Sequence, residues 1–253
     1  MTQTRLPKFA FIAMLFMAPL YAMPQSGAFI VSQHGHPVGT ARFSFSPAPN
    51  GRESSSQVHI SMQGLTYALS KTEQLNPANR LRHAQISATV NGSAVNLTTT
   101  SDPAQYLLNV SANGRSTTSR LEFHPAAVLL PDFDAGALQT LLDLSSTPAN
   151  ARLGLWAIIP KQAGPQAGSI VQVQLATYRD ELGKLDGKPI LVHHLVATIS
   201  GTRSELFSGP DNQLLQAELP QQGFALVRDG FVLTPPAHPA APPADEPTST
   251  TPH

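Results

Sequence analysis

The sequence of 253 residues contains no cysteine and few charged residues, and each scarcity excludes a class of protein. Without Cys the chain has no disulfide, no thiol nucleophile, no Cys-based zinc or iron–sulfur site and no lipid-modified N-terminal Cys. Charged residues make up 13% of the chain, about half of the roughly 25% usual in soluble domains, and basic and acidic residues are equal in number. Nucleic-acid binders and binders of anionic membranes need a basic face, so this balance argues against both kinds of partner.

Residues 1–22 have the pattern of a secretory signal peptide. Arg5 and Lys8 precede an apolar run from Phe9 to Tyr21, and Ala22 supplies the small residue that a signal peptidase reads. The run has 13 residues, whereas a membrane-spanning helix needs roughly 20. No later segment is apolar enough to span a membrane. We therefore expect cleavage after Ala22 and export of the mature protein to the bacterial periplasm or the outside of the cell, with no transmembrane span.

Residues 234–253 predict an extended or disordered tail. This stretch reads TPPAHPAAPPADEPTSTTPH and contains no periodic apolar residue. Such a composition cannot add to a core, and it is typical of spacers, of ligands for Pro-binding grooves, and of tails with no selected role. What remains, residues 23–233, fits a single antiparallel β domain.

Turn dipeptides and alternating apolar residues fill that domain. Five Asn-Gly or Asp-Gly pairs, the preferred turns of tight hairpins, begin at positions 50, 91, 113, 186 and 229. Between them apolar residues recur with period two, so that each strand has one dry and one wet face. The alternating sets are Val58, Ile60, Met62; Leu65, Tyr67, Leu69; Ile86, Ala88, Val90; Tyr106, Leu108, Val110; Leu121, Phe123; and Val171, Val173, Leu175.

The stretch from Ile190 to Ile199 differs, because the residues that would face either side of the strand are apolar, apart from His193 and His194. We expect this strand to be covered on both sides.

One segment has a helical period, and it predicts a helix over about 132–144. Asp132 or Asp134 can cap its N-terminus. The helix can bury its apolar stripe only on the concave face of the sheet, either as a lid over a ligand cavity or as ordinary core packing. The stripe consists of Phe133, Ala137, Leu138, Leu141 and Leu142.

We therefore expect an all-β fold with one helix: a strongly curved antiparallel sheet, or an incompletely closed barrel, with a single amphipathic helix packed on its concave face. Residues that would line a ligand pocket are those of the helix stripe and two tyrosines on dry strand faces. These candidates are Phe133, Leu138, Leu141, Leu142, Tyr67 and Tyr106.

A family resemblance rests on residues 28–75, in particular FIVSQHGHPVGTARFSFS and SSSQVHISMQGLTYALSKTEQL. These segments are similar to the start of uncharacterised secreted bacterial proteins of the DUF3108 or DUF6134 kind, in which a Gly-x-x-Val-Gly turn leads into long antiparallel strands. Those families share with LolA- or LppX-like lipid carriers the plan of a curved, open sheet with helix inside it. The resemblance implies a periplasmic or surface protein that binds or handles a lipid.

Histidines and carboxylates are the remaining candidates for chemistry. His34 and His36 have the i, i+2 spacing of a zinc pair, but they also fit a polar turn, and a third ligand would have to come from His59, His83 or His124. His193 and His194 point to opposite faces of a strand, so they cannot share one metal ion. For these two we favour a buried neutral imidazole bonded to a backbone carbonyl over a pH-sensitive latch.

The carboxylates of Asp180, Glu181 and Asp186 are interpreted as the decoration of a solvated hairpin, although acid–base work or cation binding stays open.

Three functional hypotheses follow. Because the common hydrolase, phosphate, dinucleotide and calcium motifs are absent, the sequence favours a non-enzymatic cell-envelope protein that binds or carries a lipid or other apolar molecule, without a cofactor. The alternative is a structural or interaction domain with a solid core that contacts another envelope protein. The third is a His-based metallohydrolase. A cavity of roughly 300 Å³ or more, lined by the dry faces, separates the first hypothesis from the second.

Overall fold

The computed structural model describes residues 25–147, 153–162 and 164–235. The predicted signal segment 1–22 therefore lies outside the described residues, and so does the predicted tail apart from its first two residues.

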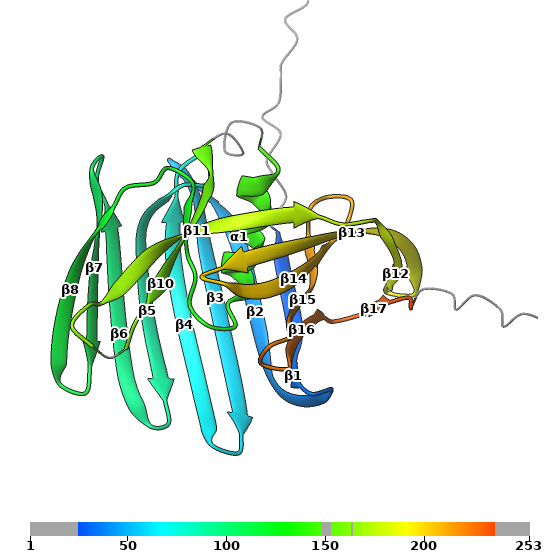
Figure 1. The fold of residues 1–253 in the computed structure, drawn as a ribbon, viewed down its shortest axis with the longest axis horizontal. Coiled ribbons are helices and arrows are strands. Elements are labelled where there is room, and N and C mark those ends of the chain that lie inside the picture. The colour runs from blue at the N-terminus through cyan, green and yellow to red at the C-terminus, as the bar shows by residue number, and fades with distance from the viewer. Residues whose placement is uncertain (1–24, 148–152, 163, 236–253) are drawn as a thin grey trace, which may run out of the picture.

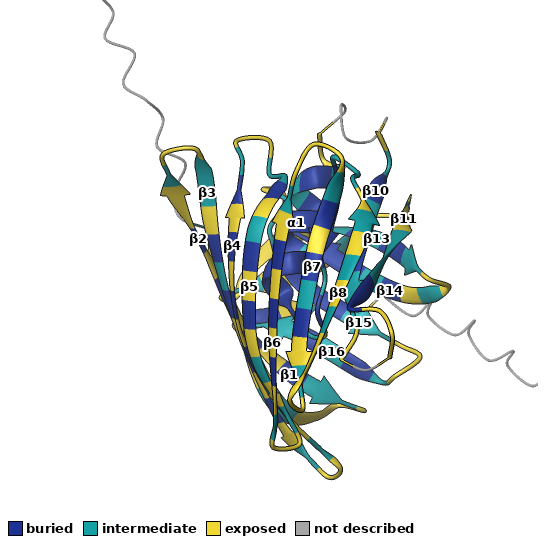
Figure 2. Cartoon of the chain, turned by 90° about the vertical axis from the view of Figure 1, so that its left-hand side faces the viewer, coloured by how far each residue is buried: buried dark blue, intermediate teal, exposed yellow. Residues whose placement is uncertain are grey.

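Eight consecutive strands form an antiparallel meander in which neighbours along the chain are neighbours in the sheet (Figure 1). Buried and exposed residues alternate along them, as the sequence predicts (Figure 2). The strands are β1 (Ser26–Gln33), β2 (His36–Ala48), β3 (Gly51–Met62), β4 (Leu65–Leu75), β5 (Leu81–Val90), β6 (Ser93–Ser101), β7 (Gln105–Ala112) and β8 (Arg115–Glu122).

Three of the five predicted turn dipeptides form tight hairpins with two positive φ angles, at positions 91–92, 113–114 and 186–187. The other two predictions are wrong in detail. Ala48 pairs with Gly51, so the β2–β3 turn is Pro49-Asn50. Asp229-Gly230 makes no hairpin, because the strand that follows it pairs with a different neighbour.

The second half of the chain extends the same sheet from the other side of β1. Its order is β1–β16–β15–β14–β13–β11–β10–β9, with β9 and β10 parallel and the other pairs antiparallel. These strands are β9 (Ala127–Leu129), β10 (Leu155–Pro160), β11 (Gly168–Thr177), β13 (Lys188–Ile199), β14 (Thr202–Ser208), β15 (Leu214–Leu219) and β16 (Phe224–Arg228). The sheet curls but does not close, since β8 and β9 do not pair with each other.

The single described helix, α1 (Ala135–Ser145), lies inside the curl (Figures 1 and 2). It packs against β2, β3, β9, β10 and β15, so its apolar residues join the inward faces of strands far apart in the chain. The fold is thus all-β with one helix on the inner face of an open sheet. No described helix has the length and apolarity to cross a membrane.

Strand β13 is covered on both sides only in part. Its inward Ala197 joins the main core, while Val192 on its other face is buried in a second small cluster with Phe207, Leu215 and Phe231. Leu191, near the start of β13, is 44% exposed, so the expectation of full cover is wrong there. This end of β13 projects from the body together with β12 (Glu181–Leu185) and β17 (Phe231–Leu233) (Figure 1).

Candidate functional site

The N-terminus of α1 is capped by Asp134, one of the two caps that the sequence allows. The carboxylate of Asp134 accepts hydrogen bonds from the backbone N–H groups of Gly136 (2.9 Å) and Ala137 (3.2 Å). Gly136 has no side chain because a Cβ there would collide with the Ser56 hydroxyl on β3. The cap therefore sits directly against the inner face of the meander.

A buried lysine ties this cap to the sheet. The Nζ of Lys71, on β4, lies 2.5 Å from the Asp134 carboxylate and 2.9 Å from that of Glu73, two residues further along the same strand face. All three side chains are almost completely buried. Two carboxylates and one ammonium leave this cluster with one excess negative charge when all three ionise.

Burial and the excess negative charge both shift the pKa values of the groups in this cluster. Burial raises the pKa of Glu73 above its ordinary value, and the charge of Asp134 adds to the rise while Lys71 opposes it. Burial alone would lower the pKa of Lys71, but Asp134 and Glu73 outweigh burial and raise it. Lys71 is therefore held in its charged form inside the protein, and Glu73 takes up a proton more readily than an ordinary glutamate does.

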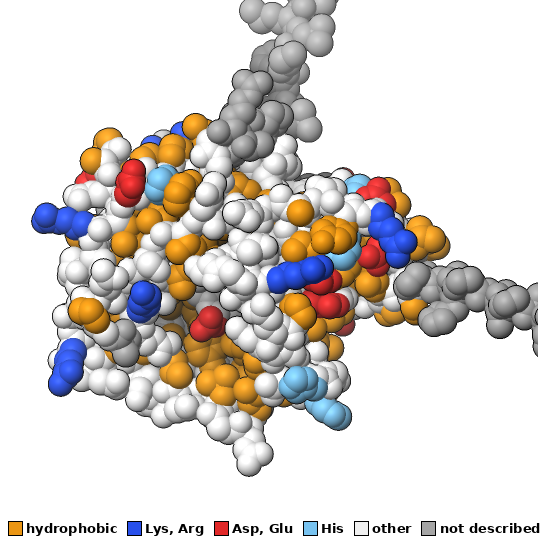
Figure 3. All heavy atoms as spheres, viewed as in Figure 1, with side chains coloured by type: hydrophobic (Ala, Val, Ile, Leu, Met, Phe, Trp, Pro, Cys, Tyr) orange, Lys and Arg blue, Asp and Glu red, His pale blue; other side chains and the backbone are white. Residues whose placement is uncertain are grey.

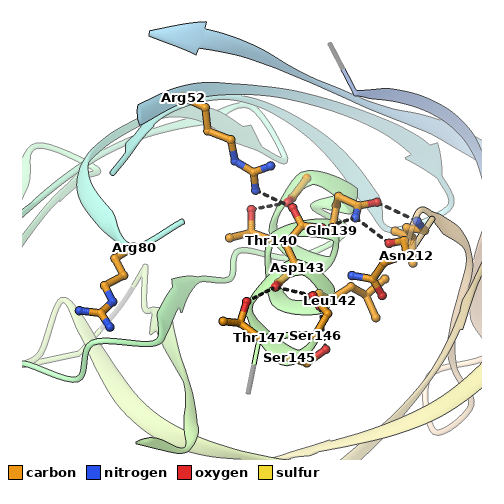
Figure 4. A network of polar contacts seen from close by, with 12 residues as sticks. Arg52, Arg80, Gln139, Thr140, Leu142, Asp143, Ser145, Ser146, Thr147 and Asn212 are labelled. Atoms are coloured by element: carbon orange, nitrogen blue, oxygen red, sulfur yellow. Dashed lines mark hydrogen bonds and ion pairs between the residues drawn. The ribbon is translucent and has the colours of Figure 1, made fainter. Parts of the chain in front are cut away.

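A second set of polar contacts holds the rest of the helix (Figure 4). Arg52, on β3, binds the Asp143 carboxylate at 2.7 Å. The Gln139 amide donates to Asp143 at 2.8 Å and to the Asn212 carbonyl at 2.9 Å, and its oxygen accepts from the backbone N–H of Leu214. The helix is thus fixed at both ends, to β3 and β4 on one side and to the chain before β15 on the other.

The segment before the cap, residues 130–134, crosses the inner face and is called here the crossing segment. Phe133 has a positive φ of 59°, which costs energy for a bulky residue. Its ring is held edge-on between Phe224, at 4.8 Å between ring centroids, and Tyr67, at 6.0 Å. The Tyr67 hydroxyl also donates to the Asp132 carbonyl at 3.3 Å. Packing therefore stabilises a left-handed backbone conformation that is unfavourable for phenylalanine.

Two hollows flank the crossing segment. The larger one has a volume of about 240 Å³ and the smaller about 60 Å³, and both share the walls formed by Leu130, Pro131, Asp132 and Ile159. Figure 3 shows hydrophobic side chains gathered in a recess in the lower half of this face. The other apolar residues of the larger hollow are Phe133, Leu138, Ile199, Leu219 and Leu226; the smaller adds Tyr67, Leu69, Ile86, Ala88, Val95, Leu97 and Val110.

The inner apolar face also continues beyond the hollows toward the hairpin ends of β2 to β5. Val38, Met62, Leu65 and Val90 are only half-buried there, although they pack against the main core. The helix is too short to cover this end of the sheet, so apolar surface stays open to the solvent around the recess.

Asp132 is the exposed acidic group at this recess. Its side chain is open to water, but the surroundings of its carboxyl group are apolar enough that desolvation raises its pKa above the ordinary value. Burial likewise raises the pKa of the neighbouring Tyr67 hydroxyl, which stays protonated. The larger hollow therefore combines a mainly apolar lining with two carboxyl groups. That of Asp134 is engaged by Lys71 and the helix N-terminus, while that of Asp132 can accept a hydrogen bond or pair with a cation.

The structure brings three of the six predicted pocket residues to the hollows. Phe133 and Leu138 line the larger hollow and Tyr67 the smaller. Leu141 and Leu142, one turn further along the helix, lie in the solid core with at most 1% exposure. Tyr106 is also fully buried, where its hydroxyl donates to the His124 carbonyl at 2.7 Å.

Sequence reasoning missed Lys71 and Glu73, although a signal was present. Both continue the inward parity of Tyr67 and Leu69 on β4, so the period of the strand places two charges on the dry face. Charged residues are almost never fully buried unless paired, and Asp134 is the partner that completes the cluster.

His34 and His36, the weak candidates for a zinc site, lie at the polar turn that the sequence favours. His34 has a φ of 47° in the β1–β2 hairpin, and its backbone N–H donates to the Gly223 carbonyl at 2.7 Å. His36 is exposed at the start of β2. Among the described residues no three His, Cys, Asp or Glu side chains are grouped as a metal site would require.

The expectation for the second histidine pair is corrected. His194 is buried, but it binds carboxylates rather than a backbone carbonyl: its Nδ1 lies 3.0 Å from Glu181 and its Nε2 3.4 Å from Glu205. His193 points the other way and pairs with Asp180 at 2.9 Å. Asp180 and Glu181 therefore hold the two histidines instead of only decorating a hairpin.

No family model, curated protein or solved structure matches the chain. The function is therefore argued from the geometry of these residues.

The stability of the protein should depend on the buried Lys71. Replacing Lys71 by Met leaves two carboxylates buried without a counter-ion, so the free energy of unfolding should fall by about 3–5 kcal/mol, measured by urea denaturation at neutral pH. Glu73→Gln is the matched control. Ionising Glu73 costs stability as the pH rises through its raised pKa, and Gln removes that cost while Asp134 still pairs with Lys71, so this variant should stay within about 1 kcal/mol of the natural protein.

The double variant, Lys71→Met with Glu73→Gln, should recover part of the loss because only one buried carboxylate remains. An unfolding free energy of Lys71→Met within about 1 kcal/mol of the natural protein would contradict the anchoring role of Lys71.

Proposed function

We propose that this chain is an exported, non-enzymatic protein of the bacterial cell envelope that binds an amphipathic molecule, such as a lipid with a single acyl chain, on the inner face of its sheet. The observation that carries the proposal is the larger hollow: 240 Å³ lined mainly by apolar side chains, beside half-buried apolar surface that the helix leaves uncovered. Each methylene group moved from water into such a hollow contributes about 0.8 kcal/mol. Export rests on the signal pattern of residues 1–22.

The exposed carboxyl group of Asp132, which lines both hollows, supports an amphipathic ligand over a purely apolar one. A ligand chain would lie along Leu138, Ile199 and Leu219, and its polar end would stay beside Asp132 and the water outside. A head group that donates hydrogen bonds or carries a positive charge fits this carboxyl best.

A second candidate function is a structural or interaction domain with a solid core. It is favoured by the size of the hollows, because each lies below the roughly 300 Å³ at which ligand pockets usually begin. The full burial of Leu141, Leu142 and Leu144, in the later turns of the helix, points the same way.

Native mass spectrometry separates the two candidates. The mature protein, purified from its native compartment, is weighed before and after extraction with organic solvent. The binding proposal predicts an excess mass that extraction removes, with a lipid recovered in the solvent phase. A protein that carries no excess mass and takes up no added dodecylammonium would be the solid-core domain.

Filling the larger hollow should abolish uptake. Leu138→Trp places a bulky indole ring where the alkyl chain would lie, so the affinity for dodecylammonium should fall at least about tenfold, measured by calorimetry. Leu107→Trp makes the same exchange at a residue of β7 that is 36% exposed on the outer face, and it should bind as the natural protein does. Equal affinities of the two variants would place the ligand elsewhere.

Asp132→Asn should change the preference for head groups. The natural protein should bind dodecylammonium more tightly than this variant by about tenfold at pH 7, because the variant lacks the carboxylate. As the pH falls through the raised pKa of Asp132 the natural protein loses this advantage, at a higher pH than an ordinary Asp would. The same dodecylammonium affinity in both proteins from about pH 4 to pH 7 would show that Asp132 does not contact the head group.

A further inference from the structure

The outer, wet face of the meander carries a separate groove of about 860 Å³. It lies on the opposite side of the sheet from the hollows, because its side chains occupy the outward positions of β1 to β6. Exposed residues on this face appear as regularly spaced bands in Figure 2. The groove is therefore a candidate site separate from the hollows.

The strand register shows that the groove runs straight across the strands. Its exposed lining consists of two neighbouring rows of directly paired residues, one per strand. Because its six strands are spaced about 4.8 Å apart, the groove is roughly 24 Å long. Its width, two rows of side chains, can hold a single polymer chain. The rows are Ile30, Thr40, His59, Ala68, Thr89, Ala94, and Ala28, Arg42, Gln57, Ser70, Ser87, Asn96.

Small side chains form the floor of the groove, since Ala68, Ser70 and Ser87 lie in its middle. The rest of the exposed lining mixes amide and hydroxyl groups with alanine, isoleucine and histidine side chains. Two cross-strand contacts hold part of the polar lining in place. The guanidinium of Arg42 donates to the Gln57 amide oxygen, and the Ser87 hydroxyl donates to that of Asn96 at 3.1 Å.

Charge and backbone chemistry narrow the class of ligand. The groove contains one arginine, and Asp229 lies at the same end, so a polyanion such as a nucleic acid would find no matching row of charges. An added peptide strand would need free backbone groups, but those of β2 to β5 are engaged by neighbours on both sides. A chain rich in hydroxyl groups needs only side-chain amides and hydroxyls at regular spacing.

We propose that this outer groove binds a linear, uncharged polysaccharide, laid across β1 to β6 with its hydroxyl groups bonded to Gln57, Ser70, Ser87 and Asn96. This site is independent of the inner hollows, since it uses the opposite face of the same strands. A protein with both sites would attach to a glycan through one face while its ligand occupies the other.

The test titrates the protein with uncharged linear hexasaccharides of glucose and of N-acetylglucosamine, observed by NMR and calorimetry. An oligogalacturonate, a single-stranded oligonucleotide and a Ser/Gln-rich peptide are titrated in parallel. We expect saturable binding of at least one uncharged hexasaccharide, with shifts confined to the groove. Failure of both hexasaccharides at millimolar concentration, or tighter binding of the anion, the oligonucleotide or the peptide, would overturn the proposal.

Two outward residues of β4 provide a matched pair of variants. Ala68→Trp fills the floor of the groove and should weaken hexasaccharide binding at least tenfold, whereas Gln74→Trp, on the same face but outside the groove, should not. Asn96→Ala removes one hydrogen-bonding amide without adding bulk and should cost about fivefold. Equal affinity of the two Trp variants would overturn the assignment. Because neither Trp reaches the inner hollows, uptake of dodecylammonium should stay unchanged in both.

Discussion

One buried ammonium group, that of Lys71, ties the helix and the crossing segment to the sheet. Lys71 contacts Glu73 on its own strand and Asp134 at the helix cap, and among the described residues no other Lys or Arg is buried. Removing charges from water is expensive, and the cost is met only because opposite charges and the helix N-terminus lie within contact distance. The position of α1, and with it the path of the crossing segment, depends on this cluster.

The hollows follow from that position. Because the cap is fixed against β3 and β4, the crossing segment must span the inner face, and Phe133 adopts a left-handed backbone conformation between Tyr67 and Phe224. The segment divides the apolar face into a larger and a smaller hollow and places Asp132 at the edge of both. Without the cluster the helix would lose its tie to β4, although Arg52 and Gln139 would still hold its later turns.

Much of the fold could be predicted from local patterns. Alternation on strands such as β3 and β4, the two positive-φ turn residues at 91–92, and the stripe and cap of the helix depend on near neighbours in the sequence. The predictions that were wrong concern residues whose contacts lie far away in the sequence. Leu141 and Leu142 share a helix stripe with Leu138, but which part of that stripe faces a hollow depends on β9 and β10. The partners of His194 come from two other segments, and no spacing reveals them.

Hydrogen–deuterium exchange with mass spectrometry tests most directly the proposal that the crossing segment is the wall of a ligand site. With saturating dodecylammonium, peptides that cover residues 130–138 and 199–204 should exchange more slowly, while those of the outer groove over 87–96 should not change. Bound ligand with unchanged exchange over 130–138 would contradict the proposal.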